Sequence, residues 1–182
     1  MIYLTSDLHL CHNKPFCFGP RGFSNVYEMN RSIVMNWHHI VQPEDEVYIL
    51  GDMMLCDDVV GTALVKQLTG KIHLILGNHD TDQRAEIFKN CWNICEVTHA
   101  TRLKYKGYHF FLSHYPCLTS NFDYDKPLKA RLISLCGHTH TKDKFADWHL
   151  GPIYHVELDA HHCKPISLDQ IIEDIEAKVR EN

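Results

Sequence analysis

The sequence predicts a single α/β domain over residues 1–182. Short apolar runs alternate with amphipathic helical patterns along most of the chain, and the first half reads strand then helix three times. The length suits one domain with a sizeable core. No linker, internal repeat or low-complexity segment divides the chain. Apolar residues make up 45% and charged residues 23%, which is an ordinary globular composition.

The first half predicts three strands and three helices in alternation. The strands are the short apolar runs Ile2–Thr5, Val47–Leu50 and Ile72–Leu76. The helices are expected at Tyr27–Val41, from Asp57 or Asp58 to about Leu68, and from Thr81 to about Lys89. The first of these places Ile33 and Trp37 on one apolar face. In the other two, the leading Asp or Thr side chain can accept the free N–H groups of the first turn.

The second half is richer in hairpins. Strands are expected at Thr98–Lys104, His109–Ser113, Leu132–Cys136 and Tyr154–Leu158. Lys106-Gly107 is a turn signal between the first two of these strands. The chain then ends in a capped amphipathic helix that starts at Ser167.

Composition and charge argue against several classes of protein. The net charge is -5 with His neutral, and no tract of Lys or Arg occurs, so a module for duplex nucleic acid is not expected. The eight cysteines form no C-x-x-C pair, which favours reduced, mostly buried thiols over a disulfide scaffold. The opening MIYLTSD is no signal peptide, and no apolar run approaches membrane-spanning length. We therefore expect a cytoplasmic protein with no membrane partner.

Ligand-type residues gather at the ends of five predicted strands. They are Asp7 with His9, Asp52, Asn78 with His79 and Asp80, His114, and His138 with His140. Ligands of open α/β sheets bind beyond the carboxyl ends of strands, and metal ligation is the commonest functional use of an excess of histidine, here 15. The spacing of two in Asp7–His9 and His138–His140 would put both side chains on one side of an extended backbone. Glycines before Asp52, Asn78 and His138 let the chain turn tightly and approach an ion.

The order of these motifs resembles the calcineurin-like metallophosphoesterase superfamily, and they span Asp7 to His140, most of the chain. The resemblance implies a four-layer αββα sandwich, with two mixed β-sheets flanked by helices and two metal ions at the strand ends. Carried over by position, one ion would be held by Asp7, His9, Asp52 and His140. The other would be held by Asp52, Asn78, His114 and His138, so that Asp52 bridges the two.

The resemblance also implies a mechanism. A hydroxide that bridges the two ions would attack phosphorus in line with the leaving group, and His79 would protonate the leaving oxygen as general acid. Asp80 would hydrogen-bond the His79 ring and favour its protonated form. Mixed imidazole and carboxylate ligands suit two divalent ions of Mn, Fe or Zn better than Mg.

Departures from the wider family bear on the substrate. Its protein Ser/Thr phosphatases place Arg before Gly-Asn-His, where this chain has Leu76, and Asp-Arg-Gly after Gly-Asp, where it has Met53-Met54-Leu55. We therefore expect a small phosphorylated substrate, and a diester in preference to a monoester, whose extra charge relatives commonly meet with an arginine. The alternatives are a phosphomonoesterase, a nuclease for short single strands, and a non-catalytic metal-binding scaffold of the same fold. The oligomeric state is left open.

Three further residues are candidates for substrate contacts, namely His12, Arg21 and Arg84. His12 and Arg21 lie in the loop at 10–26, which is either a lid whose aromatic residues stack on a base or a loop that packs onto the domain. Arg84, at the start of a helix, is either a surface residue or a phosphate clamp. His161 and His162 also follow a strand, but the resemblance implies no ligand there.

Overall fold

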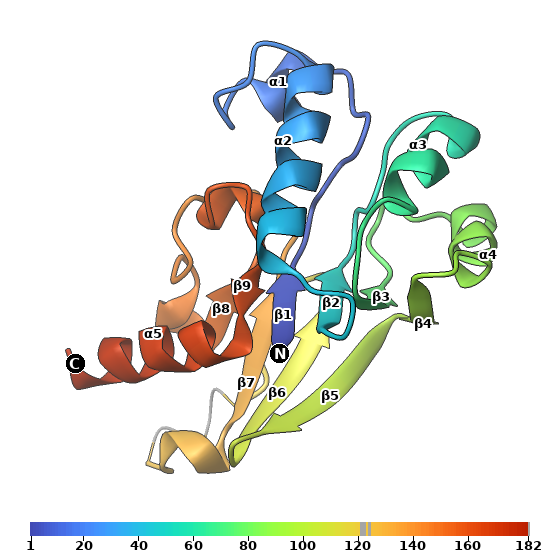
Figure 1. The fold of residues 1–182 in the computed structure, drawn as a ribbon. Coiled ribbons are helices and arrows are strands. Elements are labelled where there is room, and N and C mark those ends of the chain that lie inside the picture. Colours follow the sequence, from blue (N-terminus) through green and yellow to red (C-terminus); the bar gives the residue numbers. More distant parts are fainter. Residues whose placement is uncertain (121–122, 124, 182) are drawn as a thin grey trace.

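The computed structural model describes residues 1–120, 123 and 125–181, and it contains two mixed β-sheets flanked by helices, as predicted (Figure 1). The five-stranded sheet has the order β4-β3-β2-β1-β9 and the four-stranded sheet the order β5-β6-β7-β8. The first sheet consists of β1 (Ile2–Thr5), β2 (Glu46–Leu50), β3 (Lys71–Ile75), β4 (Ile94–Thr98) and β9 (Ile166–Ser167). The second consists of β5 (Ala100–Tyr105), β6 (Tyr108–Ser113), β7 (Leu132–Cys136) and β8 (Ile153–His155).

Most neighbouring strands run parallel, which brings their carboxyl ends to one edge. The neighbours among β1, β2, β3 and β4 pair in parallel, and only β9 is antiparallel in that sheet. In the second sheet β6, β7 and β8 are parallel, and β5 pairs with β6 as an antiparallel hairpin. The predicted turn joins that hairpin, with Lys106 and Gly107 at φ 48° and 84°. These positive angles suit a two-residue hairpin loop.

The helices are α1 (Pro15–Phe18), α2 (Val26–Ile40), α3 (Asp58–Val65), α4 (Asp82–Lys89) and α5 (Leu168–Arg180). Short 3-10 turns cover Leu128–Ala130, Trp148–Leu150 and Leu158–Ala160. Each of the four longer helices begins after a side chain that accepts a backbone N–H of its first turn; these caps are Asn25, Asp57, Thr81 and Ser167. The last three were expected from the sequence.

Strand alternation separates two hydrophobic clusters. Along β2, Val47 and Ile49 face the cluster that includes Trp37 of α2, while Leu50 faces the cluster shared with the second sheet and α5. Figure 1 shows α5 beside β9, and α4 beside β4. The first sheet is therefore buried on both faces, which explains why its strands read as continuous apolar runs.

Two predicted strands differ from the observed ones by more than one residue at an end. Thr98–Lys104, expected as one strand, is divided between the end of β4 and most of β5, because the chain passes from one sheet to the other at His99. The predicted strand Tyr154–Leu158 corresponds to a shorter β8, and Glu157 then makes only an isolated bridge to Ser6.

All eight cysteines are free, and four of them are buried: Cys17, Cys91, Cys136 and Cys163. None of the described helices combines the length and hydropathy that a bilayer crossing requires.

Candidate metal centre

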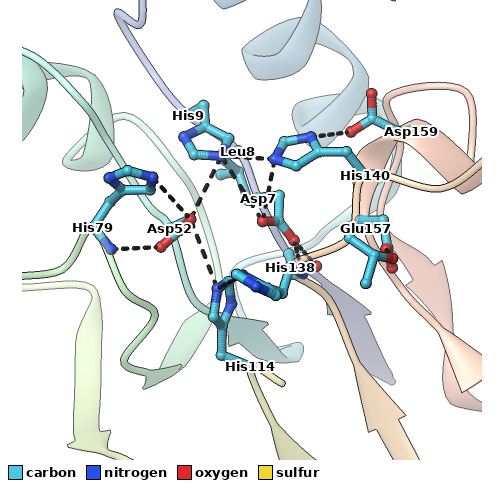
Figure 2. Close-up of polar contacts among 12 residues, drawn as sticks. Asp7, Leu8, His9, Asp52, His79, His114, His138, His140, Glu157 and Asp159 are labelled. Carbon is cyan, nitrogen blue, oxygen red and sulfur yellow. Dashed lines mark hydrogen bonds and ion pairs between the residues drawn. The ribbon is translucent and has the colours of Figure 1, made fainter. Parts of the chain in front are cut away.

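The carboxyl ends of strands from both sheets converge on one cluster of imidazoles and carboxylates (Figure 2). Asp7 and His9 follow β1, Asp52 follows β2, and Asn78 follows β3. His114 follows β6 of the second sheet, and His138 and His140 follow β7. All seven predicted metal ligands therefore lie at this edge.

The first group of donors surrounds the imidazole of His9. Its Nε2 lies 3.0 Å from Nε2 of His140 and 3.8 Å from Oδ1 of Asp7. Asp52 Oδ2 is 3.6 Å from the same nitrogen, and Asp7 Oδ1 is 3.6 Å from His140 Nε2. The donor atoms of Asp7, His9 and His140 lie within 4.8 Å of one another, as a metal ion requires, and Asp52 approaches them at His9.

The second group adjoins the first through Asp52. Oδ2 of Asp52 is also 3.7 Å from His114 Nε2, which lies 2.8 Å from Asn78 Oδ1 and 3.2 Å from His138 Nδ1. Asn78 Oδ1 and His138 Nδ1 are 3.0 Å apart. The same carboxylate oxygen thus faces both groups. By distance alone Asp7 also joins Asp52 and His114, with ligand atoms within 4.8 Å of one another.

The backbone that presents these donors is not extended. Five donor residues have φ in the left-handed region: Asp7 at 55°, His9 at 46°, Asp52 at 56°, His138 at 76° and His140 at 52°. We expected an extended backbone with a period of two to align Asp7 with His9 and His138 with His140, and this is wrong. The members of both pairs nevertheless point into the donor cluster. Such angles in non-glycine residues cost of order 1–3 kcal/mol each and persist only where the surroundings impose them. Here Asp7 N donates to Gly51 O and His9 N to Asp52 O, each at 3.0 Å.

Two glycines let the carboxylates approach the backbone. A Cβ on Gly137 would lie 2.4 Å from Asp7 Oδ2 and 2.1 Å from Ser6 Oγ, and one on Gly77 would lie 2.3 Å from Asp52 Oδ1. These distances are shorter than van der Waals contact allows. Gly77 and Gly137 therefore allow the carboxylates of Asp52 and Asp7 to lie close to the backbone.

The hydrogen bonds and burial of Asp7 show whether the cluster suits a metal cation. Oδ2 of Asp7 accepts from Ser6 Oγ at 2.6 Å and from His138 N at 2.9 Å, whereas its buried Oδ1 has no hydrogen-bond partner among the described residues. Burial raises the pKa of Asp7 to about 6 and lowers that of His9 to about 2, so His9 is neutral. An unpartnered carboxylate oxygen beside lone-pair nitrogens fits a divalent cation, which would satisfy them together.

Partners of the outer ring nitrogens select the tautomers. Nδ1 of His114 lies 2.8 Å from Leu50 O, and Nδ1 of His140 lies 3.0 Å from Asp159 Oδ2. Since a carbonyl and a carboxylate can only accept, each Nδ1 carries the proton and each Nε2 offers its lone pair to the centre.

The structure places Arg21 behind the centre, so its prediction as a substrate contact is wrong. The guanidinium is 1% exposed and donates to Asp159 at 3.1 Å and 2.7 Å, to Asp7 O at 2.7 Å and to Leu8 O at 3.2 Å. Burial raises the pKa of Asp159, but the hydrogen bonds from His140 and Arg21 outweigh it and hold the pKa at about 2. The sequence interpretation missed Asp159, although it follows a predicted strand as the ligands do.

Arg84 is also occupied by the protein. It donates to the carbonyl oxygens of Met54, Cys56 and His79 at 2.8–3.1 Å and pairs with Asp58 at 3.1 Å. The prediction of a phosphate contact for Arg84 is therefore wrong, because its donors hold the loops that follow β2 and β3.

His79 stands at the open side of the centre. Its side chain is 41% exposed, its Nε2 lies 3.9 Å from Asp52 Oδ2, and its backbone N–H donates to Asp52 Oδ1 at 2.9 Å. Asp80 is buried and accepts backbone N–H groups of Asp52, Met53 and Gly77 at 2.7–3.1 Å. No contact among the described residues joins Asp80 to the His79 ring, so that part of the prediction is wrong. Asp80 instead fixes the loop that carries Asp52.

A second buried carboxylate that the sequence interpretation missed, Glu157, supports the turn between His138 and His140. Its Oε1 accepts from Thr139 Oγ1 at 2.9 Å and lies 3.1 Å from Nδ1 of the buried His155 (Figure 2 labels Glu157). Burial lowers the pKa of His155, but the carboxylates of Glu157 and Asp147 outweigh it and raise that pKa.

The remaining candidates divide between the centre and the surface. His12 lies beside His9, with ring centroids 5.4 Å apart, and beside Phe16, at 5.3 Å. Most of the loop at 10–26 packs onto the core through Cys17, Phe18 and Phe23, but Phe16 stays 73% exposed. His161 bonds to a backbone carbonyl, and neither it nor His162 contacts the centre within the described chain.

Comparisons with known proteins agree with this geometry. Residues 1–153 match the calcineurin-like phosphoesterase superfamily domain. An uncharacterized protein of Methanocaldococcus jannaschii, MJ1445, is 32% identical over 180 residues, which cover 96% of this chain and 91% of that protein. The Gene 66 protein of Mycobacterium phage L5 is 27% identical over 76% of this chain and 77% of its own. The crystal structure of the protein of unknown function AQ665 from Aquifex aeolicus superposes with a TM-score of 0.71 at 24% identity, covering 95% of this chain and 98% of that one. The chain belongs to the calcineurin-like phosphoesterase superfamily.

Proposed function

We propose that this protein is a phosphoesterase that binds two divalent transition-metal ions and hydrolyses phosphodiesters of small or nucleotide-like substrates. The observation that carries the proposal is the position of Asp52 Oδ2, 3.6 Å from His9 Nε2 in one donor group and 3.7 Å from His114 Nε2 in the other. A carboxylate placed between two sets of donors is what a dinuclear centre requires.

Each ion would have four protein ligands. Asp7, His9, Asp52 and His140 would hold the first, and Asp52, Asn78, His114 and His138 the second. Their imidazole nitrogens and carboxylate oxygens favour Mn, Fe or Zn. When bound, such ions supply positive charge that stabilises a phosphoryl transition state, and they lower the pKa of water to provide a nucleophile.

His79 is the proposed general acid. Its backbone is held on both sides, by Asp52 at its N–H and by Arg84 at its carbonyl, while the ring remains half-exposed beside the centre. The ring is therefore positioned and open to a substrate. A non-catalytic scaffold would have no use for a free imidazole at this place, which favours an enzyme.

The proposed preference for diesters rests on charge. Arg21 and Arg84 are both engaged with carboxylates and backbone carbonyls, so neither offers a guanidinium to the second charge of a monoester. Two carboxylates and a bound hydroxide would cancel three of the four positive charges of two divalent ions, and a singly charged diester can balance the one that remains.

Metal analysis and turnover of two matched substrates test the proposal. We expect about two ions per chain and a higher kcat/KM for bis-p-nitrophenyl phosphate than for p-nitrophenyl phosphate with Mn²⁺ at neutral pH. Asp52→Asn should lose bound metal and turnover together, whereas Asp169→Asn, on the surface of α5, should lose neither. Activity that survives exhaustive chelation would refute the metal-dependent reading. A monoester favoured tenfold or more would refute the diester preference alone.

A further inference from the structure

A cavity of about 330 Å³ opens beside the metal centre. His9, His79 and His140 form the wall nearest to the ligands, and His12, Phe16 and Lys142 form walls further out. A substrate whose phosphorus lies at the centre must place one of its ester groups in or near this cavity, because His79 and two ligands border it.

A second cavity, of about 670 Å³, lies on the other side of three of these residues. Pro20, Lys142 and Asp159 line both cavities, and the walls of the second also include the exposed His39 and His162. Lys142 therefore borders the cavity beside the centre on the side that faces the second cavity.

Two charged residues line both cavities, Asp159 and Lys142, and Lys142 is the one available to a ligand. The carboxylate of Asp159 is neutralised by Arg21 and also accepts from His140. Lys142 is exposed and has no hydrogen bond or ion pair with any residue that the structure describes. It follows the ligand His140 by two residues, so a short tether fixes its distance from the centre. An ammonium in this setting is a compact, hydrated cation that can bind a phosphate at low cost in desolvation.

Another lining residue of the cavity beside the centre, Phe16, suits an aromatic group. Phe16 is 73% exposed, and its ring stands edge to face with His12 at 5.3 Å. An exposed aromatic ring beside a phosphate-processing centre can stack on a nucleobase. The cavity therefore presents both an aromatic surface and a cation beside the centre, the two features that would contact the base and a second phosphate of a nucleotide.

We propose that Lys142 binds a second phosphate of the substrate, so that the preferred substrate is a nucleotide diester carrying a further phosphate on the same sugar. This inference rests on the proposed function and adds a specificity-determining residue to it. The contact forms with the substrate before any bond breaks, so it lowers KM and leaves kcat nearly unchanged.

Two chromogenic diesters that share a leaving group test the proposal. They are thymidine 5′-(p-nitrophenyl phosphate) and its 3′-phosphorylated form. For the wild-type protein with Mn²⁺ we expect kcat/KM to be roughly five- to tenfold higher for the 3′-phosphorylated diester. The difference should lie in KM. Lys142→Met should bring this ratio close to one, and raising the salt concentration should weaken the wild-type preference. Because the ratio compares two substrates on one preparation, partial misfolding of the variant cannot change it.

Lys14 provides the matched control. It is exposed in the same region, and its charge acts on His12, but it lines neither cavity. Lys14→Met should keep the wild-type ratio. Normal turnover of both diesters without a preference for the 3′-phosphate would overturn the role of Lys142 and leave the proposed function standing. An equal loss on both substrates in Lys142→Met, or an equal fall of the ratio in Lys14→Met, would overturn it too. No turnover of either diester would refute the proposed function itself.

Discussion

Replacing Asp159 by asparagine would remove a charge from behind the metal centre and keep the shape of the side chain. Asp159 accepts two hydrogen bonds from Arg21, at 3.1 Å and 2.7 Å, and one from His140 at 3.0 Å. Since the Arg21 side chain is 1% exposed, Asp159→Asn would leave a guanidinium buried without a counter-charge. The same change would weaken the acceptor that fixes the His140 tautomer, because an amide oxygen carries less charge than a carboxylate oxygen.

The size of the effect can be worked out in two ways. Breaking a buried ion pair by removing one partner costs about 3–5 kcal/mol, and the carbonyls of Asp7 and Leu8 that still hold Arg21 place this case near the lower bound. Independently, a pKa of about 2 for Asp159, below its ordinary value of 3.8, corresponds to about 2–3 kcal/mol. Because that pKa is depressed, the stabilisation is present at neutral pH and is lost as the pH falls from about 4 towards 2. We expect about 3 kcal/mol, or a Tm lower by roughly 6–12 °C.

The assay is thermal unfolding at pH 7 with a chelator present, followed by calorimetric titration with Mn²⁺. Affinity at the ion held by His140 should fall roughly 10- to 100-fold, as for other partners of ligating histidines. The control is Asp169→Asn, which perturbs contacts with Lys106 and Tyr105 at the surface and should leave the Tm nearly unchanged. If Asp159→Asn unfolds at the temperature of this control and binds metal like the wild type, the supporting role of Asp159 is wrong.

Three further predictions concern other parts of the site. His79→Gln should keep both ions but lose about 10²- to 10⁴-fold in kcat on alkyl diesters and less on p-nitrophenyl esters; loss of an ion would instead make His79 a ligand. Gly137→Ala should displace Asp7, whose Oδ2 would lie 2.4 Å from the new Cβ, and weaken metal binding severalfold by calorimetry; unchanged affinity would contradict this. The raised pKa of His155 means that protonation stabilises the fold below about pH 6.5, so the Tm should fall as pH rises above the folded-state pKa. A His155→Gln variant with the same pH slope would exclude that source.

The sequence could place the candidate ligands at one edge but not what holds them there. Asp7, Asp52 and His114 each come within two residues of the end of a strand, and parallel strands end at one edge. The partners of Arg21 and Arg84 could not, because they are mainly backbone carbonyls of distant loops, which have no signature in the side-chain pattern.

Local reasoning also misjudged two conformations. Asp80 was expected to contact its neighbour His79, but it reaches the N–H groups of Asp52 and Met53, residues far away in sequence. The left-handed backbone of His138 and His140 was missed as well, because it is uncommon even for histidine, which is enriched there, and the surrounding hydrogen bonds impose it.

The two donor groups affect how firmly the two sheets are held together. Each proposed ion takes ligands from both sheets: His140 joins three residues of the first sheet, and His114 with His138 joins two. An ion in either place would therefore act as a further cross-link between the layers, beside the hydrogen bonds of His114 to Leu50 and of His138 to Asp7. At a free metal concentration a thousandfold above Kd, one such ion adds about 4 kcal/mol to the free energy of unfolding. If the proposed ions bind, withholding the metal would lower the stability of the seam between the two layers and make it more open to proteases.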